Sequence, residues 1–535
     1  MSSLAISSGL HADRLCTFPA QQRLKIRELV CLVAIVAAFL IAEIHNARLR
    51  PFWFDELATL FVATQPTVGA MFRSMPSDGN PPLYFLLARL CLQLPVNPEL
   101  GLRLPSVLAL PASALAVFIF VRRITSFRFG LLSMCMLLGS SIGDRYGVEA
   151  RPYALLMLFT ALLLCFWQSA RIPSDRRWAL PGIALCTSGA ILSHQYGIIY
   201  VVLPIVTGEA IRWIVRKHVD VGVLLCIGLW SLTILWTYPP MLHAQALLLS
   251  VIRSADTFSA RPGWADLGTY ERMYPLLLPS LFLFVALAWA LGSAFIPRRK
   301  VVPERSFSVQ PEDLAVADVL TMFVPIMVLL THLGTKYFIA RYAIGSALGI
   351  ALLGGILAAY AGTRWRFANG LVSLLVLYCV TAGMLSLWIP AKQRPPVDYA
   401  VSIFAVVPGT EPIVVASALE FMPSWWYSDR PTRRRLHYLS DLQSAKVIPN
   451  MIPEYSLFLD RHQTPMQMED YGSFLRTHRT FLVYSAGLPG LEWLGTRLLR
   501  EGWDLKLIAS SKRGKLFRAT AALAQHPTSA APSVQ

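Results

Sequence analysis

Charged residues are scarce in this sequence. Only 15% of its 535 residues are Asp, Glu, Lys or Arg, whereas 55% are hydrophobic and the mean hydropathy is +0.52. Average soluble chains carry about 25% charged residues, so this composition excludes an ordinary soluble globular protein. The net charge is +17. The basic residues come in short clusters between apolar runs, which indicates lipid headgroups and membrane topology and argues against nucleic acid as a partner.

Several other signatures are missing. The eight cysteines show neither metal nor disulfide spacing, and none follows Cys379. No glycine-rich phosphate loop, nucleotide-sugar fingerprint or internal repeat is visible. No cluster of His, Asp and Glu indicates a metal site, so none is predicted and a divalent metal is left open. The first apolar run lacks a small-residue cleavage site, which predicts an uncleaved membrane anchor.

Repeated apolar runs closed by Arg or Lys predict an all-α polytopic membrane protein. After a cytoplasmic tail at 1–28, we expect about eleven spans within a membrane domain at 29–390. These are 29–46, 104–121, 129–143, 152–170, 178–193, 196–211, 219–238, 275–296, 314–333, 342–361 and 369–390. With this count, every inner connection is short and basic, as the positive-inside rule requires.

The run 82–94 is apolar but too short for a span, and Arg89 interrupts it. We therefore expect a helix that lies on the outer surface, within an outer loop at 48–103 that carries juxtamembrane helices.

The chain changes character after Pro390. Short strand-like runs at 413–416, 436–439 and 481–484, a helical pattern at 489–501 and a hairpin-like pair at 505–508 and 515–518 predict a small α/β domain at 391–522. With eleven spans before it, this domain is expected on the outer side of the membrane, which is the periplasmic side if the cell is a bacterium with two membranes. The Ala/Pro/Ser-rich end, 523–535, is predicted to be disordered.

The carboxylates of Asp55 and Glu56 are the leading candidates for a catalytic site. They follow the first apolar run and stand beside Phe52 and Trp53, which have the character of interfacial aromatics. Ionisable groups at membrane depth are costly unless they are solvated or used. The alternative is that the pair only begins a solvated loop.

Polar clusters at other span ends are predicted on the same side of the membrane. Singly, each fits anchoring of a helix end. Together, paired cations and tyrosines beside carboxylates indicate a base that faces a phosphate site. The candidate binding residues are Asn80, Arg103, Arg145, Glu149, Arg151, Tyr153, His194, Tyr196, Lys336, Arg341 and Tyr342.

The order and spacing of five short motifs resemble the GT-C membrane glycosyltransferases. Over roughly residues 30 to 345, the chain is similar to glycosyltransferase family 39 and its relatives, the protein O-mannosyltransferases and the lipid A aminoarabinose transferases. The motifs are Trp53-Phe54-Asp55-Glu56, Asn80-Pro81-Pro82-Leu83-Tyr84, Arg103-Leu104-Pro105-Ser106, Glu149-Ala150-Arg151-Pro152-Tyr153 and Arg341-Tyr342.

The resemblance implies transfer of a sugar from a polyprenyl-phosphate carrier to an extracytoplasmic acceptor, with inversion at the anomeric carbon. It implies that Asp55 acts on the acceptor hydroxyl, with Glu56 as its neighbour, and that Arg341 and Tyr342 lie near the carrier phosphate. Two positions depart from the family. Asn80 stands where relatives often have His or Lys, and Tyr153 stands where some have Asp.

The chemistry agrees with this implication. A departing dianionic lipid phosphate is stabilised by fixed cationic donors, and an acceptor hydroxyl needs a base within hydrogen-bond reach. The sugar is not encoded in a motif, and the acceptor is a glycan, a lipid or a protein. The resemblance implies a multi-pass protein of the bacterial inner membrane, with its active site facing the periplasm.

Two alternatives stay open at this point. Outer-face cations together with Glu43, Glu209 and Asp318 motivate a transporter or flippase for an anionic lipid-linked sugar. A receptor or assembly scaffold that uses the C-terminal domain is the other.

Overall fold

The computed structural model describes most of the chain. The described residues are 23–239, 241–242, 246, 250, 262–274, 309–334, 338–364, 368–388, 396–446, 448, 452–461, 463–487, 492–512 and 514–521. The chain forms two compact units, which are described one at a time. The helical unit comprises Met1–Leu49, Pro81–Tyr238 and Pro262–Ala391, and the second unit comprises Arg50–Asn80, Pro239–Arg261 and Lys392–Gln535.

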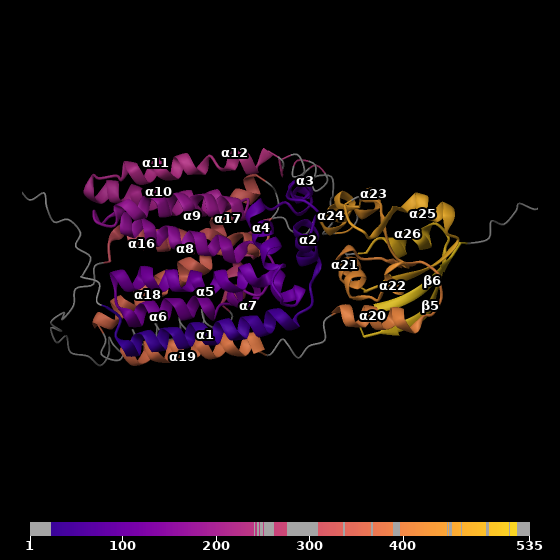
Figure 1. Ribbon diagram of the computed structural model, residues 1–535, viewed down its shortest axis with the longest axis horizontal. Coiled ribbons are helices and arrows are strands. Elements are labelled where there is room, and N and C mark those ends of the chain that lie inside the picture. The colour runs from indigo at the N-terminus through magenta and orange to yellow at the C-terminus, as the bar shows by residue number, and fades with distance from the viewer. Residues whose placement is uncertain are drawn as a thin grey trace, which may run out of the picture. The chain divides into compact units, whose positions relative to one another are not determined.

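The helical unit is a bundle of long helices that run roughly parallel or antiparallel to one another (Figure 1). Its described elements are α1 (Ile26–Leu49), α4 (Pro82–Cys91), α5 (Pro98–Ile124), α6 (Phe127–Leu138), α7 (Ser141–Tyr146), α8 (Tyr153–Ala170), α9 (Arg176–Ser193), α10 (Gly197–Arg216), α11 (Val221–Ser231), α12 (Ile234–Thr237), η1 (Trp264–Gly268), α14 (Thr269–Met273), α16 (Pro311–Thr321), α17 (Phe323–Leu333), η2 (Ala340–Ala343), α18 (Gly345–Arg364) and α19 (Ala368–Trp388).

Six helices of the described chain are long and apolar enough to cross a membrane. They are α1, α5, α8, α10, the segment Ala340–Gly362 and the segment Gly370–Leu387. A seventh span is possible if α16 and α17, which meet at a 55° bend, cross together. The helices confirm a mainly helical, multi-pass membrane protein. The count of eleven stays a prediction, and the predicted span at 275–296 lies outside the described residues.

Close approach of backbones holds parts of this bundle together. Gly349 of α18 faces the end of α16, where an added Cβ atom would lie 2.1 Å from the Thr321 nitrogen. Without a hydrophobic driving force between helices in lipid, such small residues allow the close packing that stabilises membrane bundles. The short run that begins at Pro82 forms α4, a helix of only 10 residues.

The second unit contains a mixed six-stranded sheet of order β3-β2-β1-β4-β6-β5. Strands β1, β2, β3 and β4 pair in parallel, and β6 pairs antiparallel with β4 and β5. The predicted small α/β domain is therefore confirmed. Its strands are β1 (Ile413–Val415), β2 (Leu436–Ser440), β3 (Gln467–Asp470), β4 (Thr480–Ser485), β5 (Asp504–Ser511) and β6 (Gly514–Thr520).

Helices cover both faces of the sheet. Alternate side chains of a strand point to opposite faces, so each strand contributes apolar side chains to the packing on both sides. On one face, Val414 and Phe481 join a buried cluster with Phe474 and Leu498 from the helices. On the other face, Tyr484 packs against Phe404 and Tyr438 packs against Phe421. The helices of this unit are α2 (Phe54–Ala63), α3 (Val68–Asp78), α20 (Pro396–Val406), α21 (Ala418–Tyr427), α22 (Arg430–Arg433), α23 (Leu442–Ala445), α24 (Ile452–Asp460), α25 (Tyr471–Thr477) and α26 (Leu494–Arg500).

Residues 50–80, which carry Asp55 and Glu56, pack with the C-terminal segment in this unit. Helix α2 contacts α21, and α3 contacts α24. The predicted disordered end, 523–535, and most of the predicted tail at 1–28 lie outside the described residues.

Candidate active site

Five aromatic side chains gather at one end of the helical unit and form what we call the aromatic cluster: Tyr146, Tyr153, His194, Tyr196 and Tyr342. Tyr153 begins α8, His194 follows the last residue of α9, Tyr196 precedes α10, and Tyr342 lies in η2 just before α18. Successive helices that run antiparallel bring alternate ends together, which explains why residues so distant in sequence meet here.

The rings of the aromatic cluster form a continuous chain of contacts. Ring centroids lie 4.8 Å apart for Tyr146 and Tyr153, and 5.3 Å apart for Tyr153 and His194. His194 stacks on Tyr196 at 5.6 Å, and Tyr196 meets Tyr342 edge-on at 4.9 Å. These separations are typical of favourable aromatic pairs.

Cations surround the aromatic cluster. The Arg341 Cζ atom lies 5.8 Å from the centre of the Tyr153 ring, and the Arg145 Cζ atom lies 5.8 Å from the Tyr146 ring. Arg151 is buried, and the buried carboxylate of Glu149 lies 3.8 Å from the Arg145 Nε atom. A cluster of this kind offers positive charge next to apolar ring faces, which suits an anionic group attached to a larger apolar or sugar moiety.

His194 adds no charge to this site. Burial, together with the positive charges of Arg151 and Arg341, lowers the pKa of His194 to about 3. The backbone N–H of Tyr196 donates to Nδ1 of His194 at 3.1 Å. Nδ1 is therefore an acceptor, and the neutral ring carries its proton on Nε2. His194 can donate one hydrogen bond from Nε2 to a ligand.

Tyr200 holds the segment that carries Arg341 and Tyr342. Its hydroxyl donates to the Tyr342 carbonyl at 3.0 Å and accepts from the Gly345 N–H at 3.0 Å. Tyr200 belongs to none of the sequence motifs and was not among the predicted site residues. It stands four residues after Tyr196 on α10, so the two share one helix face, and this spacing was the available signal.

Arg103 lies in different surroundings from the arginines of the cluster. Its buried guanidinium donates from Nη1 to the Ala47 carbonyl at 2.7 Å, near the end of α1. Ser106, one turn further along α5, donates to the Arg151 carbonyl at 3.1 Å and contacts the Tyr84 hydroxyl at 3.1 Å. This geometry favours a role for Arg103 in joining α1 to α5, close to the backbone of Arg151.

Asp55, Glu56 and Asn80 belong to the second unit, whereas the aromatic cluster belongs to the helical unit. Asp55 is half-buried in the first turn of α2, where the helix dipole favours a negative charge. Glu56 is buried, and its Oε2 atom accepts from the Trp53 N–H at 3.4 Å, as a helix cap does. Asn80 donates to Asp78 at 3.4 Å. Lys336 lies outside the described residues.

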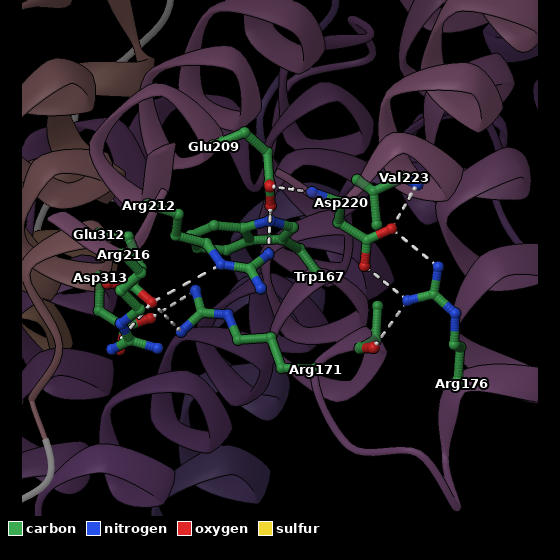
Figure 2. Close-up of polar contacts among 11 residues, drawn as sticks. Trp167, Arg171, Arg176, Glu209, Arg212, Arg216, Asp220, Val223, Glu312 and Asp313 are labelled. Carbon is green, nitrogen blue, oxygen red and sulfur yellow. Dashed lines mark hydrogen bonds and ion pairs between the residues drawn. The ribbon is translucent and has the colours of Figure 1, made fainter. Parts of the chain in front are cut away.

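An ion network at the opposite end of α8 from Tyr153 was not predicted (Figure 2). Arg171 contacts Asp313 at 2.9 Å and Glu312 at 3.6 Å, and it lies over the Trp167 ring at 3.8 Å. Four arginines face four carboxylates here, so the network is balanced in charge. Its members are Arg171, Arg176, Arg212, Arg216, Glu209, Asp220, Glu312 and Asp313.

This network bears on the transporter hypothesis. Glu209 accepts from Arg212 at 2.7 Å, from the Trp167 indole at 2.7 Å and from the Asp220 N–H at 2.8 Å. Glu209 therefore joins α8, α10 and the start of α11 by hydrogen bonds. Asp318 is exposed, and among the described residues no group of three or more His, Cys, Asp and Glu is arranged to hold a metal ion.

Comparisons with known proteins agree with the motifs. Residues 79–236 match the family model of dolichyl-phosphate-mannose-protein mannosyltransferase. A comparison with curated proteins gives no match. ArnT from Cupriavidus metallidurans in the apo state is 12% identical, with a TM-score of 0.58 over 92% of this chain and 98% of that chain. ArnT bound to undecaprenyl phosphate is 12% identical, with a TM-score of 0.56 over 91% of this chain and 98% of that chain.

At 12% identity, the two ArnT structures show the fold alone. The segment that matches the family model runs from α4 to α11 and contains three of the five motifs. The resemblance inferred from the sequence is confirmed at the level of the fold: this chain has the fold of the ArnT structures, and residues 79–236 match the mannosyltransferase family model.

Proposed function

We propose that this protein is an integral-membrane glycosyltransferase that moves a sugar from a polyprenyl-phosphate carrier to an acceptor outside the cytoplasm, with inversion. The observation that carries the proposal is the placement of Arg341 and Arg151 beside a neutral His194 within the aromatic cluster. A motif-matched segment and a fold shared with a protein solved with undecaprenyl phosphate support the same assignment.

The cations would act on the leaving group. As the bond between the anomeric carbon and the phosphate oxygen breaks, the lipid phosphate departs with its negative charge increased. Guanidinium groups already in place stabilise that charge without reorganisation, and a single such donor commonly contributes about 10²–10³ in rate. Arg341 and Arg151 are the residues we assign to this task, and the ring faces of Tyr153 and Tyr342 would line the sugar and carrier.

Asp55 would act on the acceptor. The acceptor oxygen attacks the anomeric carbon from the side opposite the phosphate, its proton passes to Asp55, and the configuration inverts in one displacement. Helix α1 ends at Leu49 close to the start of α5, where the Arg48 carbonyl accepts a hydrogen bond from the Asn97 side-chain amide. The chain continues from the end of α1 into the segment that carries Asp55, and within the helical unit Arg103 joins that end of α1 to α5.

The same proposal covers location and domain roles. The protein would reside in the bacterial inner membrane with the aromatic cluster toward the periplasm, and the domain at 391–522 would lie in that compartment. Glu56 caps the start of α2 and is assigned a structural role, so Asp55 alone is assigned as the base. No described feature favours a transporter over this reaction.

Mass spectrometry of surface glycans tests the proposal in cells that lack the protein and in cells that carry restored copies. Wild-type protein should restore a glycan, lipid or protein species whose mass differs by one sugar. An Asp55→Asn copy, present in the membrane at the same level, should not restore it, whereas Glu56→Gln should restore most of it. Normal product from Asp55→Asn would reject Asp55 as the base.

A further inference from the structure

We propose that three consecutive residues of the C-terminal domain, Trp425, Trp426 and Tyr427, are positioning residues for the Asp55 carboxylate. We call them the α21 aromatic triplet, because they form the last turn of α21. The inference rests on the proposed function, in which Asp55 takes the acceptor's proton. Its structural basis is that α2, which carries Asp55, packs on α21 within one compact unit.

The triplet contacts α2 near both of its ends. The backbone N–H of Phe52, just before α2, donates to the Tyr427 hydroxyl at 2.7 Å, and the Phe52 ring meets Trp426 edge-on at 6.3 Å. Phe61, in the last part of α2, lies 6.2 Å from Trp425 and 6.4 Å from Trp426. Contacts before and near the end of one short helix fix both its direction and its rotation about its own axis.

Arg433 contacts the triplet and the end of α21. The Arg433 Cζ atom lies 5.0 Å from the centre of the Trp425 ring. Arg433 also donates from Nε to the Ser428 carbonyl at 2.8 Å and from Nη2 to the Trp426 carbonyl. These bonds satisfy carbonyls at the end of α21 and limit movement of the triplet against the domain.

No member of the triplet needs to touch the reacting atoms to matter. Asp55 projects from the first turn of α2, and successive residues of a helix are rotated by about 100°. A small rotation of α2 therefore changes where the carboxylate points. A base misplaced by about 1 Å can lose on the order of 10² in rate, so the packing of α2 on α21 sets the efficiency of proton transfer.

The test compares Tyr427→Phe, Trp426→Ala and the conservative Trp426→Phe in the full-length protein. Tyr471→Phe is the matched control, since its hydroxyl donates to Glu501 at 2.7 Å elsewhere in the same domain. Two quantities are measured: hydrogen exchange of backbone amides at 52–61 and at 480–485, and the amount of the glycan product in restored cells. The exchange measurement does not depend on sugar transfer.

Tyr427→Phe and Trp426→Ala should raise exchange at 52–61 by about fivefold or more, because a hydrogen bond or a ring contact of α2 is lost. Exchange at 480–485, in the core strand β4, should stay unchanged. Product should fall by about tenfold in Trp426→Ala and return with Trp426→Phe. Tyr471→Phe should leave residues 52–61 unaffected.

Unchanged exchange at 52–61 in both Tyr427→Phe and Trp426→Ala would overturn the inference, and so would equal acceleration of strand β4. Asp55→Asn separates this inference from the proposed function. That variant should lose product with normal exchange at 52–61. If it kept its product, the base assignment would fail and the inference would fail with it. Loss of product in Asp55→Asn together with unchanged exchange in the triplet variants would overturn the inference alone.

Discussion

At the scale of single residues, similar side chains have unlike surroundings. Arg341 lies over the Tyr153 ring at the aromatic cluster, whereas Arg103 donates a hydrogen bond to the Ala47 carbonyl. Asp55 and Glu56 are adjacent, yet Glu56 caps α2 and Asp55 does not. A charged residue's role here depends on the partner that the fold supplies.

Replacing Arg341 by Lys should lower the amount of glycan product by about 10²-fold or more, because Lys keeps the charge but lacks the planar, fixed donors of Arg. Quantitative mass spectrometry of the product in restored cells measures this. Arg177→Lys, at an exposed position near the other end of the bundle, is the control and should leave product unchanged. Full product from the Arg341→Lys copy would remove Arg341 from the phosphate site.

Glu454 should make the C-terminal domain less stable as pH rises. Burial raises the pKa of Glu454 from 4.5 to about 8, and its carboxyl group contacts Tyr438 and the Trp493 indole. A group whose pKa is raised on folding stabilises fully below its unfolded pKa, and that contribution is lost as pH rises through the folded pKa. Hydrogen-exchange protection of β2 should therefore fall between about pH 5 and pH 9.

Glu454→Gln should flatten this pH dependence, since an amide does not titrate. Asp504→Asn, at an exposed position on β5, should keep the wild-type slope. A wild-type slope in Glu454→Gln would show that another group governs it.

At the scale of helices and strands, the ends of the elements carry the chemistry. The aromatic cluster is built from the starts of α8, α10 and α18 and the end of α9. The ion network is built from the opposite ends of α8, α9 and α10 together with the starts of α11 and α16. The bodies of the helices supply packing. Hydropathy locates these bodies well, but it does not reveal the 55° bend between α16 and α17 within the single span predicted at 314–333.

Removing one acid from the ion network should be costly. Glu312 is fully buried and lies within 4 Å of Arg171, Arg212 and Arg216. Glu312→Gln leaves four arginines facing three carboxylates, and the one positive charge without compensation destabilises the protein by about 3–5 kcal/mol. Thermal unfolding in detergent should show the loss, and Asp318→Asn, an exposed acid on the same helix, should show none. Equal melting temperatures would mean that the network contributes nothing to stability.

Gly349 should tolerate no larger residue at the contact of α18 with α16. Gly349→Ala places a methyl group against the Thr321 backbone, which cannot move aside as a side chain can, and overpacking of this kind costs about 1–3 kcal/mol. The control is Gly228→Ala in α11, where an added Cβ meets nothing within 4 Å. A lower melting temperature for the first variant only would confirm the contact, and identical values would contradict it.

At the scale of the whole molecule, the proposed reaction requires one end of the helical unit to face the periplasm. Arg145 is exposed beside the aromatic cluster, and Arg177 is exposed in the first turn of α9, near the ion network. The two positions therefore report on opposite ends of the bundle.

Cysteine labelling of intact cells tests this orientation, in a background where the exposed Cys31 is replaced. A membrane-impermeant reagent should label Arg145→Cys in intact cells and Arg177→Cys only after the membrane is opened. Labelling of both positions in intact cells, or the reverse order, would contradict the proposed topology. The positive-inside pattern is the physical basis for the expectation.

The sequence alone determined the class of this molecule. Apolar runs, basic clusters and alternating strand patterns are local signals, so they indicated a helical membrane body followed by a small α/β domain. The order of short motifs also identified the GT-C resemblance. The polar residues at span ends included four of the five members of the aromatic cluster, namely Tyr153, His194, Tyr196 and Tyr342.

Only the tertiary structure decided which side chains are partners. Three contacts join residues that are far apart in the chain. Arg171 pairs with Asp313, Arg103 donates to the Ala47 carbonyl, and α2 packs on α21. Such pairings leave no local pattern, because the free energy of a buried charge or ring depends on what surrounds it after folding and not on its sequence neighbours.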